Sequence, residues 1–325
     1  MNLTLMLALR DSADCRFVVL DDTAADPALY DALAGFQRTD LMRAYGWAQI
    51  FHFDGGSSRW TTMLKLAPVQ SRLVWFRGSA RKSGVVEIFK RWILPFATHV
   101  ACSEAVGRAL SVKNVVIYSA GHIDWFDKTA AAEKLYDLAI VGRLRPVKNH
   151  QLFRDIVILG GFSFIVIGGT STGATGHVNA TERMLRDLAR PGIDLVTGSV
   201  PRTEVPELIK LARVSVCTSD YEALGHGNLV EPMALGVPAV ARRVGGTEEA
   251  FSPQTEWLLL PSDASAEDLV GKIRLAMSSS SVSEDCSLFV NQRFSLGKML
   301  NSYLDLYSKV NSKIAGTQNR PDINP

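Results

Sequence analysis

The stretch DYEALGHGNLVEPMALGVPAVARRVGGTEEA, residues 220–250, decides how this sequence is interpreted. Glu222 and Glu231 stand in an apolar frame with five glycines, directly after the apolar run VSVCTS. In open α/β sheets a ligand binds just beyond the carboxyl ends of the strands, so a strand at VSVCTS predicts a site here. Two carboxylates beside bare backbone suit a ligand rich in hydroxyl groups, such as a sugar or a ribose. The alternative is that Glu222 is exposed and that Glu231 only favours the helix dipole.

The same alternation of short apolar runs and helical patterns continues along most of the chain, which is typical of parallel sheets covered on both faces. The expected strands are 16–20, 49–53, 72–76, 99–102, 114–119, 137–141, 163–167, 194–196, 214–218, 238–241 and 256–260. The sequence therefore predicts an α/β protein with two doubly wound, Rossmann-like domains, 1–130 and 131–295. We also expect a helix at 296–311, which can pack back on the first domain, and a disordered tail at 312–325.

Composition excludes several classes of protein. The 325 residues are 47% hydrophobic and carry a formal net charge of +2, so a full core is expected and nucleic-acid binding is not. The four cysteines lie far apart without a CxxC pair, which argues against a zinc site or a disulfide framework. The start MNLTLMLALRDSADC lacks the basic region of a signal peptide, and no apolar run is long enough to span a membrane. We expect a cytoplasmic protein.

A second candidate segment is VGRLRPVKN, residues 141–149. Gly142 allows a tight turn after a strand, and Arg143 and Lys148 follow it near a helix start. Backbone N–H groups at a helix start together with two cations suit a diphosphate. A surface loop with ordinary basic residues is the alternative.

The turn between the two glutamates, GHGNL, has the features of a binding loop. Gly225 and Gly227 let the backbone approach a ligand closely. Asn228 is a good N-cap for the helix that carries the second glutamate. His226 either touches the ligand or is exposed, and Leu229 completes the candidate binding set.

These motifs, in this order, resemble the retaining glycosyltransferases of family 4, the glycosyl transferases group 1, which have the GT-B fold. The family patterns are GR-x-x-x-x-K, S-x-x-E, E-A-M-A-x-G-x-P-V-V-A and G-G-x-x-E. The residues that meet them are Gly142, Arg143 and Lys148, then Ser219 and Glu222, then the run EPMALGVPAVA from Glu231, and finally Gly245, Gly246 and Glu249.

The resemblance implies two domains that face a cleft, with a nucleotide-sugar donor on the C-terminal domain and a glycan or lipid-linked acceptor on the N-terminal one. Arg143 and Lys148 would hold the diphosphate and stabilise the departing nucleotide, while Glu222 would contact the donor sugar and Glu231 the ribose. The implied reaction retains the anomeric configuration and serves polysaccharide or glycoconjugate biosynthesis. No cofactor and no metal ion are expected, because two cations take the place of a metal and no DxD motif is present.

The sequence also departs from the family. Eight residues lie between Glu222 and Glu231 where the family usually has seven, so the turn around His226 carries an extra residue. Arg77 stands where members often have a histidine, and His52 is either its substitute or a structural histidine. The family's opening strand and Gly-rich loop are missing, which suggests truncation. Two alternatives follow: a truncated, catalytically inactive binding subunit, and a GT-B nucleotide-sugar epimerase.

The segment ARKSGVVEIFKRWILPF, residues 80–96, mixes basic and large apolar residues. As an amphipathic helix it would lie on an anionic membrane surface, and a lipid-linked acceptor would place the protein at the inner face of the membrane. An ordinary half-buried helix of the N-terminal domain is the alternative.

Overall fold

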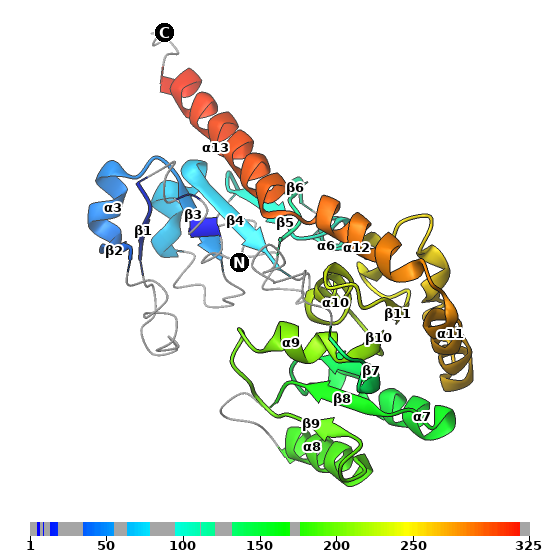
Figure 1. Cartoon of the computed structure of the whole chain (residues 1–325). Coiled ribbons are helices and arrows are strands. Elements are labelled where there is room, and N and C mark those ends of the chain that lie inside the picture. Colours follow the sequence, from blue (N-terminus) through cyan, green and yellow to red (C-terminus); the bar gives the residue numbers. More distant parts are fainter. Residues whose placement is uncertain are drawn as a thin grey trace. The chain divides into compact units, whose positions relative to one another are not determined.

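The computed structural model of the chain describes residues 5–6, 9, 14–18, 35–54, 64–78, 95–110, 112–120, 132–169 and 176–318, with the backbone alone at 54, 176–179 and 313–318. The chain divides into two units (Figure 1). One unit consists of Met1–Ser119 and Leu296–Pro325, and the other of Ala120–Ser295. The domain limits predicted at 130 and 295 are not tested by this division and stay predictions.

The unit Ala120–Ser295 is built on a parallel sheet of six strands in the order β12-β11-β10-β7-β8-β9. The strands are β7 (Tyr136–Val141), β8 (Phe164–Ile167), β9 (Leu195–Val196), β10 (Ala212–Cys217), β11 (Ala239–Arg242) and β12 (Leu259–Leu260). The first strand of the unit, β7, lies at the centre, and the fourth, β10, pairs with it on the side away from β8. This is the strand order of doubly wound nucleotide-binding sheets, in which the switch point between β7 and β10 faces the ligand.

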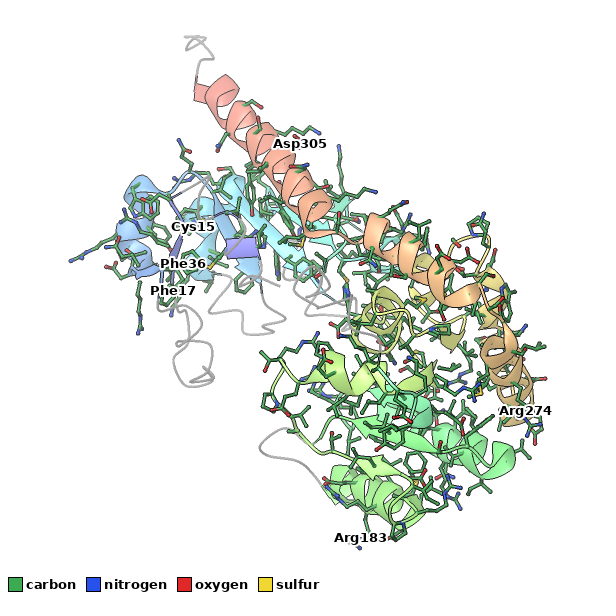
Figure 2. All side chains as sticks on the ribbon, in the orientation of Figure 1. Cys15, Phe17, Phe36, Arg183, Arg274 and Asp305 are labelled. Atoms are coloured by element: carbon green, nitrogen blue, oxygen red, sulfur yellow. The ribbon has the colours of Figure 1, made fainter. Side chains whose placement is uncertain are left out.

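Helices cover this sheet. They are α7 (His150–Gly160), α8 (Gly176–Leu188), α9 (Val205–Lys210), α10 (Glu231–Ala234), α11 (Ala266–Ser278) and α12 (Val282–Arg293). The short turns are the 3-10 helices η4 (Pro146–Lys148), η6 (Thr247–Ala250) and η7 (Glu256–Leu258) and the π-helix η5 (His226–Val230). Arg274 of α11, labelled in Figure 2, donates a hydrogen bond to the Gly160 carbonyl and lies over the Phe162 ring, which joins α11 to the end of α7.

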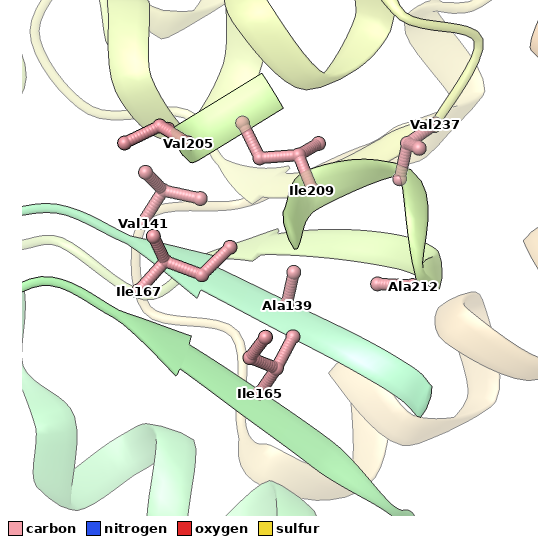
Figure 3. Close-up of a cluster of buried hydrophobic side chains, with 8 residues drawn as sticks. All are labelled: Ala139, Val141, Ile165, Ile167, Val205, Ile209, Ala212 and Val237. Atoms are coloured by element: carbon pink, nitrogen blue, oxygen red, sulfur yellow. The ribbon is translucent and has the colours of Figure 1, made fainter. Parts of the chain in front are cut away.

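One cluster of buried side chains shows why the central strands are rich in β-branched residues. Figure 3 shows the side chains of β7 and β8 that meet α9. The cluster consists of Ala139, Val141, Ile165, Ile167, Val205, Ile209, Ala212 and Val237. Each large member contributes about 1.5–3 kcal/mol when it leaves water. A strand buried on both faces needs such residues at every position, so the sequence pattern is continuous rather than alternating.

The other unit contains a parallel sheet whose strands follow in chain order, β3-β4-β5-β6, and a separate parallel pair, β1-β2. The strands are β1 (Arg16–Phe17), β2 (Gln37–Arg38), β3 (Phe51–Asp54), β4 (Leu73–Arg77), β5 (Thr98–Ala101) and β6 (Asn114–Val116), and the helices are α3 (Leu41–Trp47), η2 (Ala67–Arg72) and α6 (Glu104–Ala109). Figure 2 labels Cys15, Phe17 and Phe36 beside the pair β1-β2. Trp75 of β4 is fully buried, in a cluster with Leu66, Val69 and Leu73.

The long helix α13 (Leu296–Gln318) belongs to this unit and packs on η2. Its Tyr307 hydroxyl shares a 2.7 Å hydrogen bond with Nδ1 of His52 on β3. The helix continues past residue 311, where the predicted helix ended, and residues 319–325 lie outside the described part.

Most predicted strands lie where the sequence places them, with two differences. The strand β2 was missed because two exposed residues give no periodic signal. Residues 256–258 form the 3-10 turn η7 rather than a strand. The predicted membrane-surface segment 80–96 lies outside the described residues except for its last two. In the described part, no helix is both long and apolar enough to cross a membrane.

Candidate functional site

The switch point of the six-stranded sheet is lined by bare backbone. Gly142 follows β7 with φ +142°, and Gly168 follows β8 with φ +140°, so each adopts a conformation that favours glycine. A Cβ at Gly168 would lie 2.1 Å from the Gly142 carbonyl oxygen, so a side chain there has no room. The tight turn predicted at Gly142 is confirmed. Arg143 is exposed directly after it, and its side chain makes no ion pair with the residues that the structure describes.

Lys148 reaches from η4 to Glu222 across the switch point. Lys148 Nζ lies 2.5 Å from Glu222 Oε1, with side-chain exposures of 21% and 11%. The turn after β7 also contacts the segment after β10 through a 2.8 Å hydrogen bond from the Thr218 hydroxyl to the Lys148 carbonyl. The next residue, Asn149, has φ +48° and caps α7 by accepting from the Leu152 N–H. The structure therefore brings together two predicted residues that lie 74 positions apart.

The carboxylate of Glu222 is held by three donors on one oxygen. Besides Lys148, the Ser219 hydroxyl donates to Oε1 at 2.6 Å and the Asn228 amide at 3.4 Å. The S-x-x-E spacing explains the contact from Ser219, because this serine ends the strand segment and Glu222 follows three residues later in the turn. Charge-assisted hydrogen bonds of this kind fix the position of a carboxylate. None of these three contacts involves the other oxygen, Oε2.

The turn before Glu231 contains a π-helix. Gly225, with φ +87°, begins it, and its carbonyl accepts from the N–H of Val230, five residues later, at 3.3 Å. The Glu231 N–H likewise bonds to the His226 carbonyl. A π-turn accommodates one more residue than an α-turn. The extra residue between the two glutamates is therefore absorbed inside the helix.

This arrangement corrects the prediction for Asn228. It does not cap the helix of Glu231, because it lies inside η5, where its side chain donates to Glu222 instead. The N-cap of η5 is Gly225 and that of α10 is Val230, neither with a side-chain cap, and a Cβ at Gly225 would lie 2.7 Å from Leu229. Gly227 has more space, since a Cβ would come no closer than 3.7 Å to Val141.

His226 lies beside an aromatic ring. Its imidazole meets Phe294 edge-on, with ring centroids 6.5 Å apart. The histidine is partly exposed, so the two alternatives for it, ligand contact or simple exposure, both stay predictions. Leu229 of the same turn is fully buried and belongs to the core rather than to a surface.

Glu231 opens α10, as predicted, and its side chain is buried rather than exposed to solvent. The residue is 2% exposed. Arg202, on the segment between β9 and α9, pairs with its Oε1, while Oε2 has no hydrogen-bond partner among the described residues. Burial raises the pKa of Glu231, and the charge of Arg202 lowers it. No periodic or motif signal in the sequence marks Arg202, which is not among the predicted site residues.

The glycine pair after β11 supports Glu222 from its backbone side. Gly245 has φ +56°, and the Gly246 N–H donates to the Glu222 carbonyl at 2.9 Å. Arg242 is buried and donates to the carbonyls of Thr218 and Ser219 at 2.7 and 3.2 Å. Of the two adjacent arginines, Arg242 thus fixes the segment after β10.

Arg243 instead pairs on the surface with Glu248 and Glu256.

Two residues considered in the sequence, His52 and Arg77, lie in the other unit, where each contacts an aromatic side chain. His52 shares its Nδ1 hydrogen bond with Tyr307, and burial lowers its pKa to about 4. Arg77 is buried with its guanidinium 4.6 Å from the Trp75 ring centroid.

Among the described residues, no group of three or more His, Cys, Asp or Glu side chains is arranged to hold a metal ion. The expectation of a metal-independent site stays a prediction.

Comparison with known proteins agrees with the motifs. Residues 122–291 match the family model described as glycosyl transferases group 1. The D-inositol 3-phosphate glycosyltransferase of Saccharomonospora viridis is 29% identical over 195 residues, which cover 55% of this chain and 44% of that protein. The chain therefore matches less than half the length of this curated relative.

Two solved structures are similar over nearly the whole chain. HepE of Anabaena, in complex with UDP, has a TM-score of 0.74 and 16% identity, with 95% of each chain covered. Sucrose-phosphate synthase from Thermosynechococcus elongatus has a TM-score of 0.73 and 15% identity, with 96% of this chain and 92% of that chain covered. The predicted GT-B fold is confirmed by these likenesses.

Proposed function

The chain belongs to the glycosyl transferases group 1 family, and from this premise we propose that it transfers a sugar from a nucleotide-sugar donor to a glycan or lipid-linked acceptor with retention of the anomeric configuration. The observation that carries the proposal is the Lys148–Glu222 ion pair at the switch point between β7 and β10. A cation and a carboxylate at this position match the two ends of a sugar diphosphate, one anionic and one rich in hydroxyl groups.

The donor diphosphate would lie over the glycine turns after β7 and β8. Gly142 and Gly168 leave backbone without side chains there, which permits close approach of the phosphates. Arg143 is exposed beside the turn, and Lys148 adds a second positive charge. The crystal structures of HepE with UDP and with UDP-glucose support a uridine nucleotide as the first donor to test.

The roles of the residues follow from their charges. The bond between the anomeric carbon and the diphosphate oxygen breaks, and the acceptor hydroxyl oxygen bonds to the same face of that carbon. The acceptor proton passes to the departing diphosphate, whose charge Arg143 and Lys148 stabilise. Glu222 would accept hydrogen bonds from sugar hydroxyls through Oε2, and Glu231 would bind the ribose.

Lys148 and Glu222 exchange partners when the donor binds. In the structure each neutralises the other, so neither charge is left alone in a site of low exposure. The diphosphate then takes the place of Glu222 beside Lys148, while Ser219 and Asn228 continue to hold the carboxylate.

The test is a transfer assay with the purified full chain and a panel of UDP-, GDP- and ADP-sugars, with release of the nucleoside diphosphate as readout. Lys148→Ala and Glu222→Gln are expected to lower the rate by about 10²–10³-fold. The matched control is Arg243→Ala, which removes an exposed cation that pairs with Glu248 and Glu256 on the surface. Failure of the folded protein to bind any of these donors would overturn the proposal.

Two further measurements separate the two alternatives. An inactive binding subunit predicts that Lys148→Ala leaves function in the cell intact at normal protein levels. An epimerase predicts an altered nucleotide sugar as product without an acceptor. No observation in the site favours either alternative, since the extra residue before Glu231 is absorbed by η5.

A further inference from the structure

The ion pair between Arg202 and Glu231 joins an exposed segment to a buried carboxylate. The Glu231 side chain is 3% exposed, whereas the Arg202 side chain is 45% exposed. Pro201, Thr203 and Glu204, the neighbours of Arg202, are also exposed. Side chains of exposed segments gain little from local packing. Local packing therefore does not explain why Arg202 pairs with a buried carboxylate.

The two carboxylate oxygens of Glu231 differ in their surroundings. Oε1 accepts from Arg202 Nη2, whereas Oε2 has neither solvent contact nor a hydrogen-bond partner in the described part of the chain. A buried acceptor without a partner is destabilising, because it has lost its hydrogen bonds to water. A ligand hydroxyl that donates to Oε2 would satisfy this acceptor.

We propose that Arg202 is a positioning residue for the nucleotide: by holding Oε1 of Glu231, it fixes the carboxylate so that Oε2 accepts a hydrogen bond from a ribose hydroxyl. This inference rests on the proposed function, because it takes the ligand to be a nucleoside diphosphate. Arg202 does not itself touch the ribose; it acts through Glu231.

The charge of Arg202 also keeps the carboxylate able to accept. Burial raises the pKa of Glu231, and Arg202 opposes this effect. Without Arg202 the carboxyl group takes up a proton at a higher pH and loses one acceptor site. The elements packed against α10 are η5, α9 and α12. Their titratable and charged side chains are His226, then Glu207 and Lys210, then Glu284, Asp285, Cys286 and Arg293.

These groups do not replace Arg202 as the counter-charge. Glu207 and Lys210 pair with each other at 2.9 Å. Arg202 is the group whose charge and hydrogen bond lower the pKa of Glu231. Removal of Arg202 is therefore expected to change the pH dependence of ligand binding rather than only its strength.

The experiment is calorimetric titration of the full chain between pH 5.5 and pH 8 with whichever of UDP, GDP and ADP binds the wild type. Arg202→Ala is expected to weaken binding about 10–100-fold at pH 7 and by more as the pH falls. Arg202→Lys should restore most of the affinity and the pH profile. Arg213→Ala, which removes an exposed cation 3.9 Å from Asp137, is the matched control and should bind like the wild type.

A second ligand distinguishes positioning from general destabilisation. The 2′,3′-dideoxy form of the same nucleoside diphosphate lacks the hydroxyls that Oε2 would accept from, so the wild type should bind it weakly and Arg202→Ala should bind it no worse. Equal losses for both ligands, or an unchanged affinity and pH profile in Arg202→Ala, would overturn this inference while the proposed function stands. Absence of binding by the wild type to every nucleotide would overturn both.

Discussion

Replacing Gly245 by alanine tests how closely the glycine pair supports the Glu222 backbone. Gly245 has φ +56°, and a Cβ added to it would lie 2.0 Å from the Glu222 carbonyl oxygen. Real Cβ atoms essentially never come closer than 3.0 Å to such an atom, so one backbone segment must move by about 1 Å. The substitution therefore acts directly on the segment that carries the proposed sugar-binding carboxylate.

Two effects add to the cost in free energy of unfolding. An L-residue in the left-handed region costs about 1–2 kcal/mol. Relief of the clash with backbone costs about 1–3 kcal/mol more. Gly245→Ala should therefore destabilise the protein by about 2–5 kcal/mol, and the shifted Glu222 should lower the transfer rate by about 10²-fold.

The assay is thermal unfolding of the full chain, followed by the transfer assay at a temperature at which the variant is folded. A domain of this size loses about 2–4 °C in Tm for each kcal/mol. Gly271→Ala is the matched control, because Gly271 lies in α11 with nothing within 4 Å of an added Cβ. Alanine there should be neutral or stabilise by up to about 1 kcal/mol. If Gly245→Ala unfolds within about 0.5 kcal/mol of the wild type, the argument from close approach is wrong.

Three further outcomes are expected. Ser219→Ala removes the 2.6 Å donor to Glu222 and should lower the transfer rate about 10-fold at nearly unchanged stability, as rate and unfolding measurements will show. Arg242→Met leaves carbonyls after β10 without their buried donor and should destabilise by about 3 kcal/mol in denaturant unfolding; an unchanged midpoint would contradict this. His52 has a folded pKa of about 4, below its ordinary 6.5, so the unfolded chain binds the proton first. Stability should fall by roughly 3 kcal/mol from pH 6.5 to pH 4, and His52→Phe should remove this part of the slope.

The parallel sheet and the residues at its strand ends were predictable because they follow from local patterns. Apolar runs place β7 and β10, and residues that follow two adjacent parallel strands meet at one edge of the sheet. Lys148 and Glu222 therefore lie together as the sequence indicates, although 74 positions separate them. The order of the motifs further indicates that Lys148 and Glu222 belong to the same site.

The contacts that could not be predicted depend on geometry between segments. The pairing of Arg202 with Glu231 depends on the path of an exposed segment after β9, and no periodicity describes that path. Asn228 looks like an N-cap in the sequence, yet the extra residue produces a π-turn that points its amide at Glu222. A single inserted residue can be counted from the sequence, but where the backbone absorbs it is settled by packing.

The membership of α13 in the first unit has a consequence for biosynthesis. The chain leaves the ribosome from its N-terminus, and domains generally fold as they emerge. The unit Ala120–Ser295 is continuous in the chain and can fold as soon as Ser295 has been released, whereas the other unit must wait for Leu296 and the helix that follows. His52 meets its partner Tyr307 only after 255 more residues have been made. Residues 1–119 are thus synthesised before the unit Ala120–Ser295, yet their own unit is completed after it.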